Sequence, residues 1–284
     1  MMISSLLIVG TIGILRRYIP LSSALLAFFR GLIGAASLSV FFILFRKKKW
    51  QKANRRQLTG MVVNGAFLGV NWILLFEAFN YTTIAKATLS YYMQPTFLLL
   101  LSPLVFRERL TLKKILCAIA ALAGMVFVSG VIGSGSSRDG ELKGVACGLG
   151  AAGFYTLVVI LNKKISGVDV CQKTIVQLFS AAVVLLPYLL ITSGFQGVEL
   201  NGKLILLLLI AGIVYTGVVY ALYFGSMDGL KAQTISALSY IDPITAMAVS
   251  AAVFRESLPA IGVAGAFLIL GAAIIGEMNI HRIR

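Results

Sequence analysis

The sequence is poor in the residue types on which most soluble enzymes depend. It has one histidine, His281, three cysteines, and charged residues at only 12% of its 284 positions, whereas a soluble domain has roughly a quarter. A single histidine, located after the last apolar run, argues against most metal sites and most His-based catalytic sites, and an odd number of cysteines in apolar segments indicates no disulfide framework. We therefore expect neither a metal nor a cofactor, and we do not expect an enzyme.

The sequence instead contains long apolar runs. Hydrophobic residues make up 59% of the chain. Crossing the hydrocarbon takes about 20 apolar residues in a helix, and inside lipid every backbone amide must be paired within the protein. The runs therefore predict an all-α integral membrane protein with ten transmembrane helices, at about residues 2–18, 21–44, 58–80, 84–106, 113–132, 142–162, 170–192, 203–226, 232–254 and 259–279.

The basic residues are distributed unevenly between the two sides of these helices. With the N-terminus inside, most of the 25 Lys and Arg residues, which give a net charge of +15, fall in segments on the cytoplasmic side. The positive-inside rule then predicts a multi-pass protein of the plasma membrane with both termini in the cytoplasm. Because this distribution accounts for the net charge, we expect no nucleic-acid partner. We expect the basic segment 46–56 to lie on anionic lipid headgroups.

The two halves of the chain resemble each other. A shift of 148 residues places the Tyr-Met-Gln-Pro that starts at Tyr92 on the Tyr-Ile-Asp-Pro that starts at Tyr240. We expect two repeats, residues 1–136 and 137–284, with five helices each. Because five is odd, the second repeat starts on the opposite side of the membrane, so the repeats are inverted. Inverted repeats allow one site to face either side in turn, which favours a transporter over a membrane enzyme.

The ordered motifs resemble the EamA module of the drug/metabolite transporter superfamily. A first copy is the run 76–95 followed by Phe106-Arg-Glu-Arg-Leu, and a second runs from Met227 through Asp242-Pro to Phe254-Arg-Glu-Ser-Leu. The resemblance covers nearly the whole chain. It implies ten helices in two inverted repeats and the export or exchange of a small metabolite, and it leaves amino acids, nucleotide sugars, amines and drugs open as substrates.

Asp242 is the strongest candidate for a functional residue. It lies near the middle of the predicted helix 232–254, where an ionised Asp costs roughly 2.5–3.5 kcal/mol. Pro243 cannot donate an amide and frees the carbonyl of Ser239. A carboxylate next to a free carbonyl suits a cation, an ammonium group or a proton. The alternative is a protonated Asp with a structural hydrogen bond. Gln94 and Pro95 take the corresponding places in the first half.

Aromatic and polar residues around the two prolines complete the predicted site. Aromatic rings hold ammonium groups or stack on planar substrates, although Tyr and Trp also fill contacts between helices. The predicted substrate cavity consists of Asn71, Trp72, Tyr91, Tyr92, Gln94, Tyr215, Tyr220, Ser239, Tyr240 and Asp242, with helix kinks at Pro95 and Pro243. Because a proton or a bound ammonium would each neutralise Asp242, we expect export of an amino-acid-like or amine metabolite by proton antiport, with Glu77 as a second coupling candidate.

The remaining charges within the predicted helices have structural interpretations. Arg30 pairs with a carboxylate such as Glu77 or, alternatively, binds an anion directly. Glu108 and Glu256 each begin the turn into a helix, where a carboxylate accepts from first-turn amides, so we expect helix caps. Two alternatives stay open for the whole protein: a membrane-embedded enzyme, and an importer or facilitator of the same fold.

Overall fold

The computed structural model describes residues 1–45, 52–82, 84–128, 141–192, 195, 201–254 and 260–277, and their regular elements are all helices. These are α1 (Met2–Gly10), α2 (Ile12–Arg17), α3 (Ser23–Phe45), α4 (Arg55–Tyr81), α5 (Ile84–Tyr91), α6 (Gln94–Phe106), α7 (Leu112–Val128), α8 (Glu141–Lys164), α9 (Val170–Ile191), α10 (Gly202–Gly212), the π-helix η1 (Ile213–Val218), α11 (Val219–Met227), α12 (Ala232–Ser239), α13 (Ile241–Phe254) and α14 (Ala260–Glu277).

Six helical stretches of the described chain are long and apolar enough to cross a membrane, which makes this a multi-pass membrane protein. They are Ser23–Leu44, Arg55–Tyr81, Ala87–Phe106, Glu141–Lys164, Val170–Ile191 and Gly202–Met227. The other predicted ranges are also helical, but their helices are shorter or interrupted. The range 2–18 breaks at Thr11, the range 232–254 breaks at Tyr240, and α7 and α14 have 17 and 18 residues.

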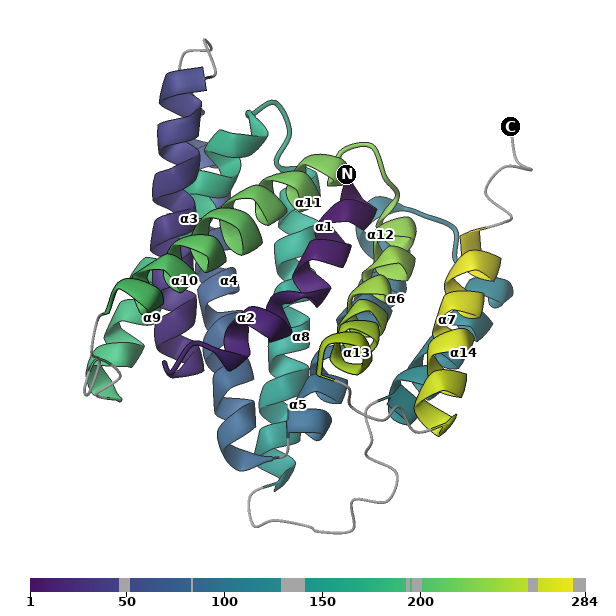
Figure 1. Cartoon of the computed structure of the whole chain (residues 1–284). Coiled ribbons are helices and arrows are strands. Elements are labelled where there is room, and N and C mark those ends of the chain that lie inside the picture. The colour runs from purple at the N-terminus through teal and green to yellow at the C-terminus, as the bar shows by residue number, and fades with distance from the viewer. Residues whose placement is uncertain are drawn as a thin grey trace.

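The helices form one bundle, and α4 makes its main contacts with two of them (Figure 1). It packs against α8 and α9, while α3 packs against α9 and η1, and α7 and α14 form a pair at one edge. Small residues allow the closest approaches. A Cβ added at Gly65 of α4 would lie 2.4 Å from the carbonyl oxygen of Gln177 on α9. Such small-residue contacts let helices associate in lipid, where burial of apolar surface supplies little driving force.

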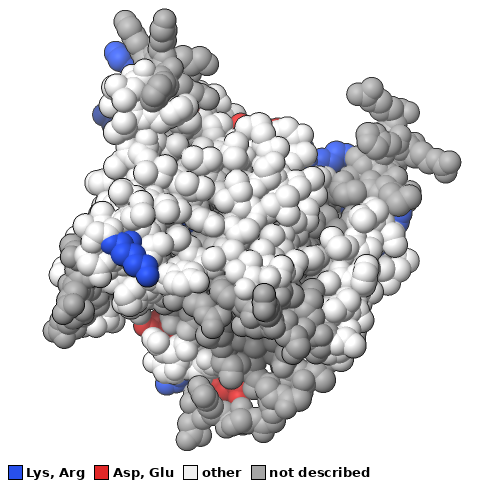
Figure 2. All heavy atoms as spheres, in the orientation of Figure 1, with Lys and Arg blue, Asp and Glu red and all other residues white. Residues whose placement is uncertain are grey.

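The surface matches a lipid environment. In the view of Figure 2 the charged side chains of the described residues lie toward the margins, and uncharged side chains cover the wide area between them. Large apolar residues are exposed at the protein surface, including Leu104, Ile191 and Phe267, which are 81%, 84% and 72% exposed. In water, apolar areas of this extent would drive association. In a bilayer they face acyl chains.

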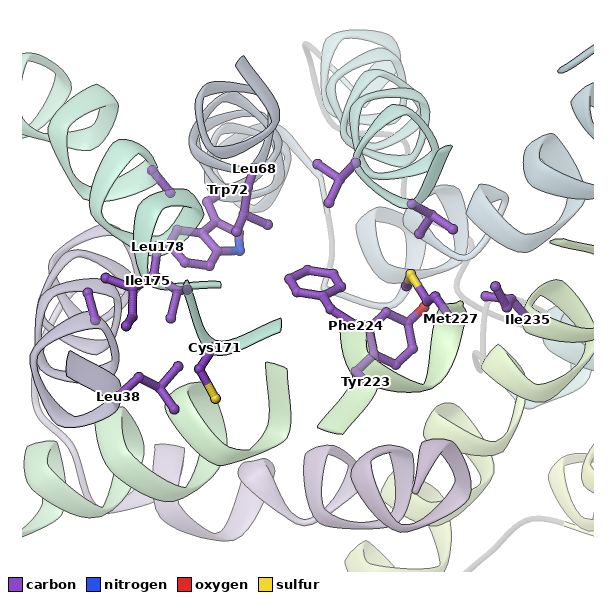
Figure 3. Packing of buried hydrophobic residues seen from close by; sticks show 14 of the residues in the cluster. Leu38, Leu68, Trp72, Cys171, Ile175, Leu178, Tyr223, Phe224, Met227 and Ile235 are labelled. Atoms are coloured by element: carbon purple, nitrogen blue, oxygen red, sulfur yellow. The ribbon is translucent and has the colours of Figure 1, made fainter. Parts of the chain in front are cut away.

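The interior core joins α3, α4, α9 and α11. Trp72 and Leu68 of α4 lie beside Leu178 and Ile175 of α9 in Figure 3, next to Phe224 of α11. Leu68, Leu178 and Phe224 are fully buried. This packing fixes the positions of α4 and α11 relative to each other, and both helices contribute side chains to the cavity described below.

One end of the bundle is held by polar contacts to the segment 228–233, which comprises the connection between α11 and α12 and the first two residues of α12. The Glu108 carboxylate accepts from the backbone N–H groups of Ala232 and Gln233, at 2.8 and 3.2 Å. The Lys163 ammonium donates to the carbonyl of Leu230, and the Lys114 ammonium donates to the side chain of Gln233. The end of α6 and the starts of α7 and α12 are thus tied together with the end of α8.

Candidate functional site: a central cavity with two separate charges

A cavity of about 390 Å³ lies between the helices that the two halves of the chain contribute. It draws residues from α1 to α6, α8 and α11 to α13, so helices that are distant in sequence meet around it. Its lining is Ser5, Leu6, Val9, Ile12, Arg30, Leu75, Phe79, Thr88, Tyr91, Tyr92, Gln94, Tyr155, Val219, Tyr220, Tyr223, Ser239 and Asp242. This volume falls in the range of cavities that hold one small molecule.

Asp242 reaches the cavity from the first turn of α13, directly after the helix break at Tyr240. The Tyr92 hydroxyl donates to its Oδ2 at 3.3 Å. Tyr92 itself lies in the corresponding break between α5 and α6, two residues before Gln94. Both breaks are close to a proline, which cannot donate its backbone nitrogen and clashes with the preceding turn. The two interrupted helices therefore bring a tyrosine and a carboxylate to the same wall.

The two interrupted helices also contact each other directly. The Ser236 hydroxyl of α12 donates to the carbonyl of Pro95, and the hydroxyls of Thr96 and Tyr240 share a hydrogen bond of 3.0 Å. Pro243 is buried, as Pro95 is. The helix starts around the two prolines are thus fixed against one another by hydrogen bonds, which holds the cavity wall in place.

Aromatic rings from several helices border the cavity. Tyr91 lies 6.1 Å from both Tyr92 and Tyr155, measured between ring centroids. Tyr220, which also lines the cavity, makes an edge contact with Trp72 at 6.5 Å. Edge and tilted pairs of this kind are favourable and orient the rings. The hydroxyl and ring faces that remain can contact a ligand through hydrogen bonds or cation–π attraction.

Arg30 enters the cavity from α3. Its Nε donates to the Thr216 hydroxyl of η1 at 3.0 Å, and that hydroxyl donates to the carbonyl of Ala211. The expected pair with Glu77 is not formed between these described residues. Glu77 instead accepts from the Tyr188 hydroxyl at 2.7 Å, because the end of α4 turns it toward α9. Arg30 is therefore a cavity residue that lacks the carboxylate partner the sequence suggested.

Comparison with known proteins decides the family. The family model described as the EamA-like transporter family matches residues 1–130 and 142–276. This chain belongs to the EamA-like transporter family. The family prediction made from the motifs is confirmed, and members of the family are transporters.

Related proteins agree with this family. The uncharacterized transporter YxxF of Bacillus subtilis is 29% identical over 246 residues, covering 87% of this chain and 78% of its own. Protein RarD of Salmonella typhi is 26% identical over 232 residues, covering 78% of this chain and 75% of its own. One solved crystal structure superposes with a TM-score of 0.83 at 18% identity, covering 97% of this chain and 96% of that chain, which shows a shared fold.

In this EamA protein, the cavity contains only part of the set of residues predicted to line it. Asn71, Trp72, Tyr215 and Tyr240 lie outside its lining because their polar atoms or rings face neighbouring helices. Asn71 donates to the carbonyl of Ala151 at 2.7 Å, and the Tyr215 hydroxyl is 2.8 Å from that of Thr11. The predicted residues that do line the cavity are Tyr91, Tyr92, Gln94, Tyr220, Ser239 and Asp242.

Sequence reasoning did not assign several lining residues of this EamA protein to the cavity, including Arg30, Tyr155 and Tyr223. The 148-residue shift relates one of them to a lining residue of the first half. Leu75 of the first half and Tyr223 of the second are at matching positions, and both line the cavity. No pattern in the sequence predicts that Tyr155 lines the cavity, because its position there depends on which face of α8 turns inward.

The predicted cap at Glu108 needs a correction. Glu108 caps the start of α12, not the start of α7, the helix that follows it in sequence. The left-handed backbone of Arg107, with φ of 55°, turns the chain at the end of α6 toward that neighbour. Glu256, His281 and most of the basic segment 46–56 lie outside the described residues. The described residues contain no group of three or more His, Cys, Asp or Glu side chains that could hold a metal ion.

Proposed function

We propose that this protein is a secondary active transporter in which two inverted five-helix repeats, residues 1–136 and 137–284, alternately expose one central cavity to the two sides of the membrane. Matching positions of the two halves line that cavity in pairs: Leu75 with Tyr223, Tyr91 with Ser239, and Gln94 with Asp242. A site shared by two repeats is the usual arrangement in transporters built from inverted repeats. All ten helical ranges cross the membrane in this proposal, including those interrupted at Thr11, at Tyr92 and at Tyr240.

The protein resides in the plasma membrane with both termini in the cytoplasm, and it exports its substrate or exchanges it. The distribution of Lys and Arg supports this orientation. The end of the bundle that carries Lys114, Lys163 and Lys173 is the cytoplasmic end. In this orientation the contacts on the segment 228–233 lie at the cytoplasmic end of the bundle.

The proposed substrate and the proposed coupling of its transport to protons both depend on Asp242. Among the described residues its carboxylate has one hydrogen bond, from Tyr92, and no ion pair. An ionised carboxylate inside the membrane is unfavourable until a cation or a proton neutralises it. A proton and a substrate ammonium group therefore compete for Asp242. This competition produces antiport of protons against an amine or amino-acid-like metabolite. The substrate ammonium group neutralises the carboxylate while the substrate is carried in one direction, and a proton neutralises it in the other.

Flux into proteoliposomes tests this function. Purified protein is reconstituted, and uptake of radiolabelled phenylalanine, leucine and phenethylamine is measured with and without an imposed pH gradient. We expect uptake above that of protein-free liposomes and a response to the gradient. Asp242→Asn keeps hydrogen-bonding capacity and should fold, yet lose the response, whereas Glu77→Gln should keep it.

The outcomes separate the remaining possibilities. Loss of the response in Glu77→Gln, with Asp242→Asn unaffected, would move the coupling role to Glu77. A wild-type flux that follows the substrate gradient and ignores the pH gradient would show a facilitator. The absence of flux for all three compounds would contradict the proposal that these are its substrates.

A further inference from the structure

An apolar groove of about 520 Å³ runs between α7 and α14, the helix pair at one edge of the bundle (Figure 1). We call it the edge groove. It shares no lining residue with the central cavity. Leu116 of α7 and Phe267 of α14 are exposed on its rim, so it opens away from the bundle toward lipid. Lys113 is the only charged side chain among the described residues that line it.

The edge groove extends along one leaflet of the membrane. The two helices are antiparallel, because Lys113 at the start of α7 and Ile275 near the end of α14 line the same groove. The lining stretch of each helix covers about 12 Å of its axis, and half of the hydrocarbon core is about 15 Å thick. The groove therefore has nearly the length of one leaflet, with Lys113 at the end closer to the headgroups. In the proposed orientation this is the cytoplasmic leaflet.

Small residues keep the edge groove hollow. Ala120, Gly271 and Ala272 belong to its lining and extend no further than a methyl group. A Cβ added at Gly271 would meet no atom of another helix within 4 Å, whereas one added at Gly124 would lie 2.7 Å from the carbonyl oxygen of Gly265. The helices thus touch at Gly124 and leave space beside Gly271. Unfilled space forfeits dispersion contacts, and a flexible acyl chain restores them.

Lys113 supplies a positive charge at the headgroup end of the groove. Its side chain is half-buried, and no hydrogen bond or ion pair of the described residues involves its ammonium, whereas the adjacent Lys114 is bonded to α12. Arg107 and Arg109, in the turn before α7, are exposed, and the carboxylate of Glu108 between them is bonded to the first amides of α12. Basic sites beside membrane helices at the cytoplasmic face attract anionic headgroups.

We propose that the edge groove binds one anionic phospholipid, with an acyl chain between α7 and α14 and its phosphate on Lys113. The charge is what distinguishes this groove. A second apolar groove of about 430 Å³, between α4 and α9 beside Ala66 and Val183, has no charged residue in its described lining. That groove can hold an acyl chain, but it offers nothing that selects a headgroup.

The same charge argues against a second copy of this chain as the occupant. A two-fold contact between copies in a membrane uses the same surface on both. It would place two Lys113 side chains at the same depth, and the described lining of the groove contains no carboxylate to separate their charges. A phospholipid with net negative charge satisfies Lys113 and fills the apolar groove at once.

A binding experiment on the purified full-length protein in detergent tests the site. The probes are dioleoyl phosphatidylglycerol, which is anionic, and dioleoyl phosphatidylcholine, which has the same chains and no net charge. Native mass spectrometry measures the affinity of the first bound lipid, and the melting temperature is followed in parallel. We expect wild type to bind phosphatidylglycerol about five-fold more tightly, which is roughly what one basic side chain contributes beside an anionic surface. Its melting temperature should rise accordingly.

Variants at the headgroup end assign this preference to Lys113. Lys113→Gln should bind the two lipids equally, because the chain still fits and the charge is gone. Lys164→Gln is the matched control, since Lys164 is an exposed lysine at the end of α8, and it should keep the five-fold preference.

Variants in the groove test the acyl chain. Gly271→Leu places a side chain in the open space and should weaken the binding of both lipids. Ala120→Leu fills the groove from α7 and serves the same purpose if Gly271→Leu does not fold. Ala66→Leu, which fills the groove between α4 and α9, is the control and should leave the preference for phosphatidylglycerol unchanged.

The proposal is overturned if wild type binds the two lipids equally, if Lys113→Gln keeps the full preference, or if the filled variants bind phosphatidylglycerol as wild type does. A wild-type dimer that Gly271→Leu dissociates, without any preference between the lipids, would instead assign the groove to a second copy. Because the readout is binding in detergent, it depends neither on the orientation in the membrane nor on transport.

Discussion

Asn71 lies deep in α4, and its amide nitrogen donates to the carbonyl of Ala151 on α8. It is fully buried, and its Oδ1 has no partner. This geometry makes it a contact between helices. Asn71→Leu, which has a similar volume, should lower the free energy of unfolding by about 0.6–1.7 kcal/mol, the range for hydrogen bonds between membrane helices. Unfolding in detergent should show this loss, while the affinity for phenylalanine stays unchanged. A large fall in that affinity would place Asn71 in the binding site after all.

At the scale of residues, the direction in which a side chain points is harder to predict from the sequence than its burial. Asn71 and Tyr240 are buried, but the rotation of each helix turns their polar atoms toward Ala151 and Thr96. Hydropathy also gives no information about which side chains, distant in sequence, will be hydrogen-bond or ion-pair partners. Arg30 was expected to pair with a carboxylate such as Glu77 because a charge deep in a helix needs a partner, yet each of the two residues finds an uncharged hydroxyl on a different helix.

Among the elements, the end of α8 shows an uncommon cap. Lys173, near the start of α9, is fully buried, and its Nζ donates to the carbonyls of Asn162 and Ile165 at 3.1 and 3.3 Å. Lys173→Met removes these donors and should destabilise the fold by about 1–3 kcal/mol, the cost of leaving buried acceptors unpaired. The unfolding midpoint in denaturant measures this change.

Asp228 provides the matched control for that variant. Its carboxylate is 4.0 Å from the Lys173 nitrogen and its side chain is 54% exposed. The contact is long and its carboxylate is open to solvent, so it contributes little, and Asp228→Asn should change stability by less than about 1 kcal/mol. If the two variants are equally destabilised, the ion pair and not the cap stabilises this end of α8.

A second cap joins elements that are far apart in the chain. Glu108 follows α6, but it satisfies the first amides of α12. Glu108→Ala should cost about 0.5–2 kcal/mol, as other N-cap losses do, and should speed hydrogen exchange in the segment 228–236. The exposed neighbour Arg109 supplies the control variant, Arg109→Gln. Unchanged exchange in Glu108→Ala would show that this contact does not hold the segment.

The positions of the helices were the most predictable feature at the scale of elements. Each apolar run contains a helix, and the breaks near Pro95 and Pro243 follow from the missing proline amide. The break at Thr11 and the π-helix Ile213–Val218 could not be foreseen. Both depend on contacts with other helices, such as the bond between Thr11 and Tyr215. The arrangement of Glu108 was missed for the same reason.

At the scale of the whole molecule, labelling of introduced cysteines tests the orientation of the protein in the membrane. Lys52 and Lys143 are exposed and lie before α4 and in the first turn of α8. In a variant whose three cysteines, Cys117, Cys147 and Cys171, are replaced by alanine, we introduce Lys52→Cys or Lys143→Cys. An impermeant maleimide added to intact cells should label the cysteine at 143 and leave the one at 52 unlabelled until the membrane is opened.

This result follows from the distribution of Lys and Arg between the two sides. The opposite labelling pattern would reverse the orientation and place the segment 228–233 on the outer side. Labelling of both positions in intact cells would contradict the number of crossings between them, which is three if each predicted range spans the bilayer.

The π-helix η1 has a consequence for how this chain tolerates changes in its length. A π turn contains one more residue than the α-helical turn it replaces, and Thr216, which holds Arg30, lies within it. Deleting one residue between Gly212 and Val219 would restore a regular α-helix and leave the residues after it facing nearly the same way, because the π turn absorbs the extra residue. Tyr220 and Tyr223 would still face the cavity, whereas Thr216, inside the turn, would move relative to Arg30. The shortened chain would keep these two tyrosines in place and lose the hydrogen bond that fixes Arg30.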